Sequence, residues 1–148
     1  MDELTTQAHD EQQTVVFRLA EESYGIEIFR VNEIIRIREV TPIPRTESHI
    51  KGLVNLRGKT IPVVDLRVRF SMPESDVTDS SRIIVVDSPL GNVGVIVDAV
   101  TEVVTLQQDE IESTPAIVSE TETDFVRGVA KRNDHLITLL DLDRALAA

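Results

Sequence analysis

Apolar and polar residues alternate along the first part of the chain in the way that is typical of β-strands. Val15, Phe17 and Leu19 stand at every second position, and Ile26 and Ile28 repeat this period after a polar turn. Side chains at that spacing lie on one face of a strand. The apolar residues are mainly Val, Ile and Leu, and the β-branched ones favour pleated sheet. We therefore expect a strand on either side of the turn.

The pattern changes directly after these strands. Val31, Ile34 and Ile35 are spaced at i, i+3 and i+4, which is the period of a helix and predicts a short helical turn. The same spacing recurs at three later residues, Val100, Val103 and Val104. A further strand is expected at 36–40, before the proline-containing connector at 41–44, which is predicted to be extended.

A β-hairpin is predicted from the turn residues that follow. The segments 53–56 and 59–64 flank a tight turn in which Gly58 supplies a positive φ. Pro62 cannot donate a hydrogen bond to a ladder, so it indicates a sheet edge or a bulge. Asp65 comes directly after the hairpin and is expected to cap a short helix.

The chain also contains an internal repeat. IKGLVNLRGKTIPVVDLR (50–67) aligns without gaps with VRGVAKRNDHLITLLDLD (126–143), and YGIEIFRVNEII (24–35) aligns with VGVIVDAVTEVV (93–104). The repeat predicts a second hairpin and a second short helix, which is capped by Asp141. The chain is thus one unit built twice.

Short strands at close spacing, with hairpins and few helices, indicate small barrels, because a closed sheet has no exposed edges. We predict a mainly β fold of two five-stranded β-barrels, one for each repeat, with short helices after the hairpins. The expected bounds are 1–13 for a disordered acidic tail, 14–70 for the first barrel, 71–81 for a boundary loop, 82–140 for the second barrel and 142–147 for the last helix.

Composition narrows the class of protein. Cysteine is absent, which excludes disulfides and zinc–thiolate sites. No apolar run approaches the roughly 20 residues that a membrane helix needs, and no signal peptide is visible, so we expect a soluble cytoplasmic protein.

The net charge of −11 argues against sequence-independent nucleic-acid binding. Residues 14–70 hold ten basic and seven acidic side chains, whereas residues 71–148 hold five and fifteen. This asymmetry is either drift on solvated surfaces or a device that pairs a basic end with an acidic end of a neighbour.

The sequence contains no convincing catalytic site. His9, His49 and His135 lie far apart in the sequence and have no neighbours at metal-ligand spacing. No phosphate-binding loop, dinucleotide fingerprint or nucleophile elbow occurs. Asp65 and Asp141 are repeat equivalents before short helices, so we interpret them as caps rather than as a catalytic pair. We expect no enzymatic activity, no cofactor and no metal.

The tip of the first hairpin is the most unusual local feature that remains. Asn55, Leu56, Arg57 and Gly58 form a turn with a bulky cation at its end. One interpretation is a plain turn with an exposed arginine. The other is a rigid hairpin that presents Arg57 as an anchor, because arginine is enriched at interface hot spots. The residues leave both interpretations open.

Several of these segments resemble the CheW family of chemotaxis coupling proteins. The resemblance is carried by IKGLVNLRGKTIPVVDLRVRF (50–70), YGIEIFRVNEI (24–34) and VGVIVDAVTEVV (93–104), and it covers about 14–147. It implies two SH3-like five-stranded β-barrels and no catalytic activity. It also implies a scaffold that couples the cytoplasmic tips of chemoreceptors to the regulatory domain of the histidine kinase CheA, at receptor arrays on the inner face of the membrane.

The resemblance also implies two sets of site residues. A receptor groove between the barrels would involve Val15, Ile28, Val31, Ile34, Gly94, Val100 and Val103, with Val15 and Ile28 at its floor. Positions linked to coupling are Glu33, Gly52, Asn55 and Arg57, together with Leu56 and Gly58 of the same turn. Whether each of these contacts receptor or kinase stays open.

The alternative for Val31 and Val100 is plain core packing. Gly52 carries a separate expectation: its repeat mate Gly128 is also glycine, so either φ is positive or another segment passes close by.

Two other functions are alternatives to the chemotaxis scaffold. One is a CheW-like coupling protein of a CheA-type pathway that controls something other than chemotaxis. The other is a barrel protein that binds a small ligand or acts as an enzyme, which should show a deep pocket with convergent polar groups.

Overall fold

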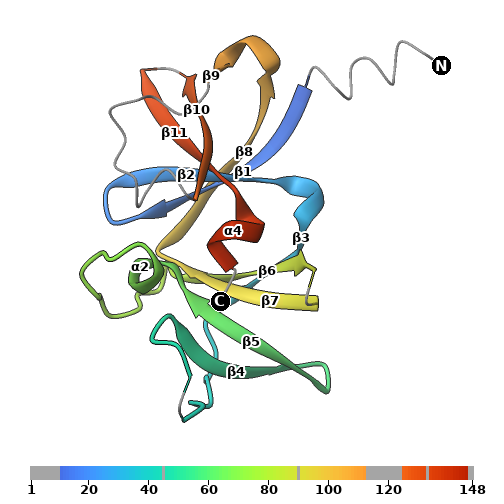
Figure 1. The fold of residues 1–148 in the computed structure, drawn as a ribbon, viewed down its shortest axis with the longest axis vertical. Helices are drawn as coiled ribbons and strands as arrows, with labels where there is room; N and C mark the ends of the chain where they lie inside the picture. The colour runs from blue at the N-terminus through green and yellow to red at the C-terminus, as the bar shows by residue number, and fades with distance from the viewer. Residues whose placement is uncertain (1–10, 45, 90, 113–124, 133, 147–148) are drawn as a thin grey trace, which may run out of the picture.

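The computed structural model describes residues 11–44, 46–89, 91–112, 125–132 and 134–146. Within them the chain forms two β-sheets, each curled into a small barrel, and Figure 1 shows one barrel above the other. The upper barrel has the strand order β8 (Ala99–Gln107), β1 (Glu11–Leu19), β2 (Glu22–Glu27), β11 (His135–Leu140), β10 (Val126–Arg132), β9 (Ile111–Glu112). The lower barrel has the order β3 (Val31–Arg36), β6 (Arg82–Ser88), β7 (Gly91–Val97), β5 (Lys59–Asp65), β4 (Ile50–Leu56).

Short helical segments follow several of these strands. They are η1 (Ile28–Arg30), α2 (Leu66–Arg69), η2 (Gln108–Glu110) and α4 (Leu142–Leu146). Both predicted caps are confirmed: Asp65 accepts a hydrogen bond from the Arg67 backbone N–H at 3.0 Å, and Asp141 accepts one from Arg144 N–H at 3.2 Å. Figure 1 shows α4 between the two barrels.

The mainly β fold with two barrels is confirmed, but the predicted bounds of 14–70 and 82–140 for the barrels are wrong. Each repeat gives its first two strands to one barrel and its remaining strands to the other, so that β1 and β2 lie with β8, β9, β10 and β11. If each strand is replaced by its equivalent in the other repeat, the two barrels have the same strand order, apart from the short strand β9. The apolar pattern of the two repeats is the same, so β3 and β8 fit either set of partners, and the sequence pattern cannot distinguish the two pairings.

The helical turns predicted at Val31–Ile35 and at Val100–Val104 are also wrong, because both segments are strands. Each strand carries a register shift, between Val31 and Glu33 in β3 and opposite Val16 and Phe17 in β8. A β-bulge inserts one extra residue and so puts residues three apart on the same face. The spacing that resembles a helix is therefore that of a bulged strand, at equivalent places in both repeats.

Other predicted boundaries need smaller corrections. The strand expected at 36–40 is absent, since β3 ends at Arg36 and 37–40 forms no regular element. The predicted tail is too long, because β1 already begins at Glu11, and 1–10 lie outside the described residues. Pro62 does not lie on an edge strand: β5 runs between β7 and β4, and its pairing with β7 begins only at Val63.

Three apolar clusters form the core. The largest fills the space between the barrels and takes residues from both of them, including Val15, Phe17, Ile84, Val86 and Leu140. A second cluster lies inside the upper barrel and a third inside the lower barrel. The two barrels are therefore packed on each other over an apolar seam rather than joined only by the chain.

Candidate partner-binding surfaces

Four of the seven residues predicted for the receptor groove lie in β3 and β8 and point to one side of their sheets. Residues opposite each other in antiparallel strands point to the same face, and Val100 and Val103 lie opposite Phe17 and Val15. Val31 and Ile34 likewise lie opposite Val86 and Ile84. These partners all belong to the cluster between the barrels. We call the predicted groove residues at the margin of this cluster the docking face: Ile28, Val31, Ile34, Val100 and Val103.

The docking face contains both exposed and half-buried side chains. Ile34 is 40% exposed and Val103 is 52% exposed, at equivalent places in β3 and β8. Val31, Val100 and Ile28 are half-buried and pack against the seam cluster. The alternative of plain core packing therefore accounts for part of the contacts of Val31 and Val100, whereas Ile34 and Val103 remain open to a partner.

Two of the predicted groove residues do not reach this face. Val15 is 1% exposed, so it supports the docking face from below, as a floor residue would. Gly94 is buried in β7, and a Cβ there would lie 2.8 Å from Ile83 Cγ2. Ile83 belongs to the cluster inside the lower barrel. The missing side chain of Gly94 therefore faces the barrel interior, away from the docking face.

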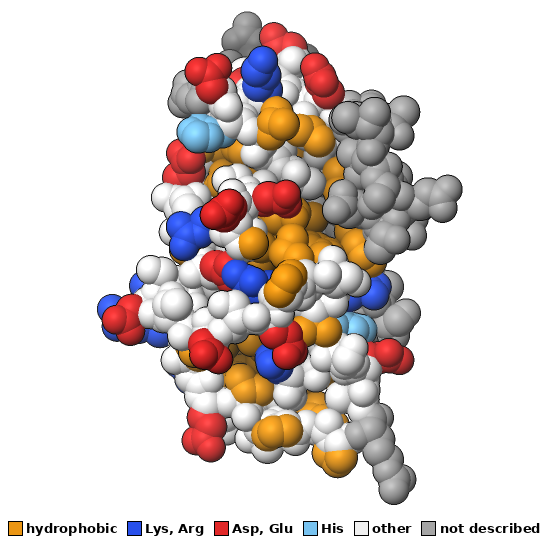
Figure 2. All heavy atoms as spheres, turned by 90° about the vertical axis from the view of Figure 1, so that its left-hand side faces the viewer, with side chains coloured by type: hydrophobic (Ala, Val, Ile, Leu, Met, Phe, Trp, Pro, Cys, Tyr) orange, Lys and Arg blue, Asp and Glu red, His pale blue; other side chains and the backbone are white. Residues whose placement is uncertain are grey.

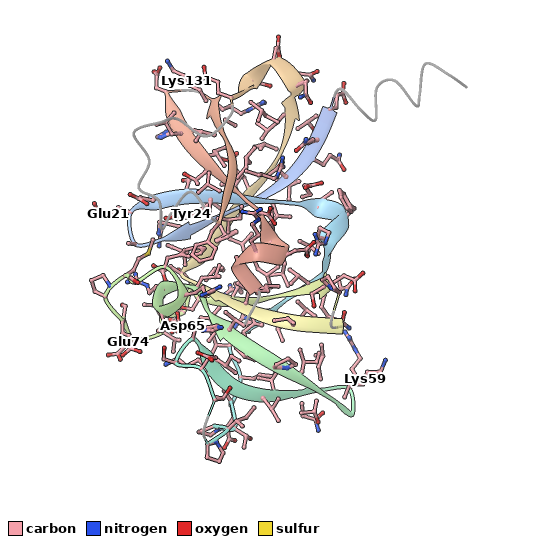
Figure 3. All side chains as sticks on the ribbon, in the orientation of Figure 1. Glu21, Tyr24, Lys59, Asp65, Glu74 and Lys131 are labelled. Atoms are coloured by element: carbon pink, nitrogen blue, oxygen red, sulfur yellow. The ribbon has the colours of Figure 1, made fainter. Side chains whose placement is uncertain are left out.

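Exposed apolar surface is not restricted to the docking face. Figure 2 shows hydrophobic side chains in a band across the middle of the side that lies at the left in Figure 1. Beneath the surface an aromatic stack runs between the barrels, with ring centroids 6.0 Å apart for Phe17 and Tyr24, which are buried, and 5.9 Å apart for Tyr24 and Phe70. Figure 3 shows Tyr24 on that side.

The β4–β5 hairpin is confirmed, and its tip is more constrained than the sequence indicates. Arg57 and Gly58 both have positive φ, of 52° and 83°, which is the pattern of a type I′ turn. The Asn55 side chain accepts a hydrogen bond from Gly58 N–H at 3.0 Å. Leu56 is only 7% exposed and belongs to the core of the lower barrel, so the prediction that it contacts a partner is wrong.

Two of the predicted coupling residues pair with each other. The Arg57 guanidinium donates to both oxygens of the Glu33 carboxylate, with Nη2 to Oε1 at 2.9 Å. These hydrogen bonds lower the pKa of the Glu33 carboxyl. The Arg57 side chain is still 72% exposed, so the pair contributes little to stability. The two hydrogen bonds hold the Arg57 side chain in one orientation at the tip of the β4–β5 hairpin.

Gly52 shows both features that were expected of it. Its φ is +149°, and a Cβ there would lie 2.0 Å from the Thr41 carbonyl oxygen. Thr41 forms an isolated bridge to Leu53, with backbone hydrogen bonds of 2.8 Å in both directions. Gly128, the repeat mate, is approached in the same way by Glu112 O of β9, at 2.8 Å from the Cβ position. Gly52 is thus a site of barrel closure, not an exposed contact.

Ion pairs across the seam were missed by the sequence analysis. Arg67 pairs with Asp98, and Arg30 pairs with Asp143, from elements that are far apart in the chain. Within the upper barrel, Arg132 donates to Thr105 O at 2.9 Å and forms an ion pair with Glu110. The repeat could not reveal the Arg132 contact, because Arg132 aligns with Leu56 rather than with Arg57.

Two charged hollows lie beside these ion pairs. One, of about 560 Å³, is lined by residues that include Lys51, Asp65, Arg67 and Asp98. Another, of about 220 Å³, is lined by residues that include Glu27, Arg30, Arg127 and Asp143. In each hollow the named charges pair with one another.

The described residues hold no group of three or more His, Asp or Glu side chains that could bind a metal ion. None of the helices in this part of the chain is long and apolar enough to span a membrane.

The fold and these surfaces together define a double-barrel protein with an apolar docking face at its seam and a charged hairpin tip. A family model described as the CheW-like domain matches residues 13–148. The chain belongs to the CheW family, and the two barrels are of the SH3-like type that the resemblance implied.

Individual relatives agree with this assignment. The chemotaxis protein CheW of Bacillus subtilis is 32% identical over 97% of this chain and 92% of its own length. That of Klebsiella aerogenes is also 32% identical, over 93% of this chain and 82% of its own. The crystal structure of the scaffolding protein TtCheW from Thermoanaerobacter tengcongensis has a TM-score of 0.86 and 42% identity, with 93% of each chain covered.

Proposed function

We propose that the protein is a non-enzymatic adaptor that couples chemoreceptor tips to the histidine kinase CheA. Membership of the CheW family supports a scaffold in chemotaxis, and relatives carry the names chemotaxis protein and scaffolding protein. The observation that carries the finer proposal is the docking face, where Ile34 and Val103 are exposed at equivalent places on two barrels.

A receptor tip is a suitable occupant for this face. An amphipathic helix recognises an apolar surface by residues spaced at i, i+3, i+4 and i+7. The docking face offers two equivalent apolar walls, Val31 with Ile34 and Val100 with Val103. The chemistry of the partner is therefore an apolar helix face, which the cytoplasmic tip of a receptor presents.

The regulatory domain of CheA is assigned to a different surface. The Arg57–Glu33 pair lies at the tip of the lower barrel and keeps a guanidinium largely exposed. A fixed cation of this kind attracts an acidic or mixed apolar and acidic patch. We therefore assign the hairpin tip to the kinase and the docking face to the receptor, and the adaptor would act at receptor arrays on the inner face of the membrane.

Substitutions on the docking face test the receptor assignment. Val103→Asp places a charge in an apolar contact, which costs several kcal/mol when the charge is unpaired, so binding of a receptor-tip fragment should weaken by at least tenfold. Val31→Asp should act in the same direction, with a larger loss of stability because Val31 packs against the seam. Val77→Asp is the matched control, since Val77 is 56% exposed and lies outside the docking face.

Binding is measured by titration calorimetry, and folding by urea denaturation of each variant. Weakened binding in all three variants, or in none, would contradict the assignment of the docking face. Failure of the wild-type protein to bind either a receptor tip or the CheA regulatory domain at micromolar concentration would contradict the proposed function itself.

A further inference from the structure

The chain passes from one barrel to the other at two places among the described strands. The first crossing is η1, between β2 of the upper barrel and β3 of the lower barrel. The second is Asp98, the single residue between β7 of the lower barrel and β8 of the upper barrel. Each crossing leads directly into a strand that carries one wall of the docking face. The direction in which the chain leaves a crossing therefore sets the position of that wall.

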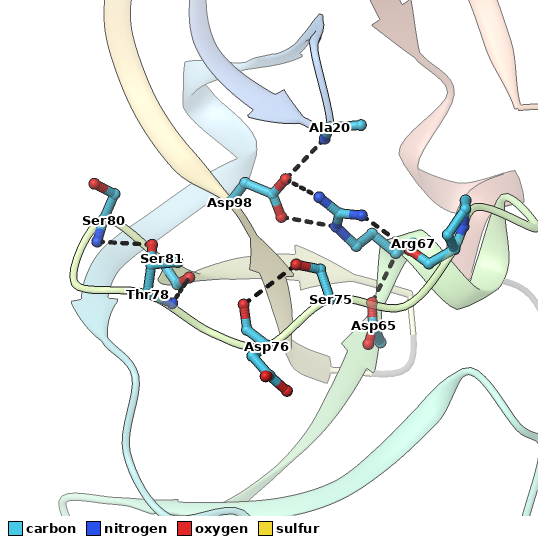
Figure 4. A network of polar contacts seen from close by, with 10 residues as sticks. Ala20, Asp65, Arg67, Ser75, Asp76, Thr78, Ser80, Ser81 and Asp98 are labelled. Atoms are coloured by element: carbon cyan, nitrogen blue, oxygen red, sulfur yellow. Dashed lines mark hydrogen bonds and ion pairs between the residues drawn. The ribbon is translucent and has the colours of Figure 1, made fainter.

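The Asp98 crossing is held by four hydrogen bonds to three other segments, as Figure 4 shows in part. Its carboxylate accepts from the Arg67 guanidinium through both oxygens, with Nε to Oδ1 at 3.0 Å. It also accepts from Ala20 N–H at 2.7 Å, in the turn between β1 and β2, where Ala20 has a φ of +55°. The Asp98 backbone N–H donates to Arg18 O at 3.0 Å.

These bonds connect the two barrels. Arg67 belongs to α2, which packs on β5 and β7 of the lower barrel, whereas Arg18 and Ala20 belong to the upper barrel. Arg67 is held in turn by its hydrogen bond to Pro73 O at 2.9 Å. One carboxylate therefore links the turn of the upper barrel to the helix of the lower barrel.

The pair is sheltered enough for its geometry to matter. The Arg67 side chain is 15% exposed and that of Asp98 is 24% exposed, in contrast to 72% for Arg57. Burial by itself would raise the pKa of the Asp98 carboxyl, but the hydrogen bonds from Arg67 and Ala20 outweigh it and lower the pKa. Loss of one partner leaves the other charge partly buried without compensation, which is costly.

We propose that Arg67 and Asp98 are positioning residues that fix the two walls of the docking face relative to each other. Val100 follows Asp98 by two positions and Val103 by five, so a change at the crossing moves this wall against Val31 and Ile34. The inference rests on the proposed function in one respect, namely that the partner uses the docking face.

The η1 crossing is also held by an arginine–aspartate pair, but the side chains of this pair are more exposed to solvent. Arg30 at the end of η1 donates to Asp87 O at 2.7 Å and to the Asp143 carboxylate of α4 at 2.6 Å. Asp143 is half exposed, at 51%, so solvent screens this pair more strongly. The Arg67–Asp98 pair is therefore the stronger constraint on the seam.

The distance between the barrels provides a direct test. The chain has no cysteine, so Lys59→Cys and Lys131→Cys can each carry a single spin label. Figure 3 shows these two residues at opposite ends of the molecule, on hairpins of the lower and upper barrels. Double electron–electron resonance on the protein that carries both labels should give a narrow distance distribution. The distribution should become broader or shift when Arg67→Ala is added. Arg132→Ala is the matched control, because its ion pair with Glu110 lies within the upper barrel.

Partner affinity provides the second readout. When only a fraction of molecules holds the competent arrangement, the apparent Kd rises by the inverse of that fraction, so a tenfold reduction weakens receptor-tip binding about tenfold. Asp98→Asn keeps the shape and one acceptor oxygen, and it replaces Arg67→Ala if that variant does not fold. Arg67→Lys keeps the charge without the two-pronged bond and should restore binding only in part.

An unchanged distance distribution in folded Arg67→Ala would overturn the proposal. So would a broadened distribution with undiminished receptor binding, since the crossing would then have no effect on docking. If the wild-type protein binds no receptor tip, the proposed function fails, and the distance measurement still decides whether the pair fixes the barrels.

Discussion

Gly52 is the position where the structure predicts the largest effect of adding a single methyl group. A Cβ at Gly52 would lie 2.0 Å from Thr41 O and 2.7 Å from Thr41 C, both of them backbone atoms. Ordinary contact begins near 3.4 Å, so the connector at 41–44 must move by more than 1 Å. That movement breaks the bridge between Thr41 and Leu53, which closes the lower barrel.

The magnitude follows from two contributions. A non-glycine residue at positive φ costs about 1–2 kcal/mol. The bridge contains two backbone hydrogen bonds, and each contributes about 1 kcal/mol net. Gly52→Ala should therefore lower the free energy of unfolding by about 3–4 kcal/mol, a large part of the 5–15 kcal/mol that is usual for a domain.

Two matched variants separate these contributions. Gly58 has a φ of +83°, and no atom of the described residues lies within 4 Å of a Cβ added there. Gly58→Ala therefore incurs only the cost of a non-glycine residue at positive φ. Gly128→Ala has the opposite character, because Glu112 O lies 2.8 Å from the Cβ position and its φ is not in the positive region. Both should be less destabilised than Gly52→Ala.

Urea denaturation of the four proteins is the assay, with the midpoint and the m-value compared at one temperature. A Gly52→Ala variant no less stable than Gly58→Ala would refute the reasoning, because the close approach of Thr41 would then cost nothing. A variant that folds normally and still fails to bind a partner would show instead that Gly52 lies at a contact surface.

Two further predictions concern charge. Arg57→Glu should slow association with the CheA regulatory domain at low salt, with a smaller defect as salt rises, because steering is screened within about 8 Å at physiological ionic strength. Stopped-flow measurements give the association rates across a salt series, with Lys59→Glu on the same hairpin as the control. If both variants behave alike, Arg57 is an ordinary turn residue. His49 is 7% exposed, and burial, followed by the nearby Arg69, lowers the pKa of its imidazole. Because the unfolded chain binds the proton more tightly, stability should decrease as pH falls below about 6.5, the unperturbed value. Denaturation midpoints from pH 5 to 8 should show this slope in the wild type and a flatter one in His49→Phe, and equal slopes would exclude His49 as its source.

The charge asymmetry along the sequence has a different meaning in the folded molecule. Residues 14–70 are net basic and 71–148 are strongly acidic, but each half contributes strands to both barrels. The excess of basic residues in the first half therefore does not make one barrel basic. Charge complementarity with a partner depends on local groups such as Arg57 and not on the two halves of the sequence.

The sequence by itself determined the features that depend on neighbouring residues. The β4–β5 turn, the caps at Asp65 and Asp141 and the internal repeat were all identified correctly, because turn geometry and capping are decided within a few positions. The constraint on Gly52 was also visible, since glycine in both repeats indicates a demand of the backbone.

Only the tertiary structure decided what depends on distant pairing. Strand exchange between the repeats, the bulges at Val31 and Val100, the burial of Leu56 and the turning of Gly94 into the barrel all follow from the register between strands. An i, i+3 spacing fits a helical turn and a bulged strand equally well. The Arg67–Asp98 pair joins residues 31 positions apart across the seam, and no local pattern selects such a partner.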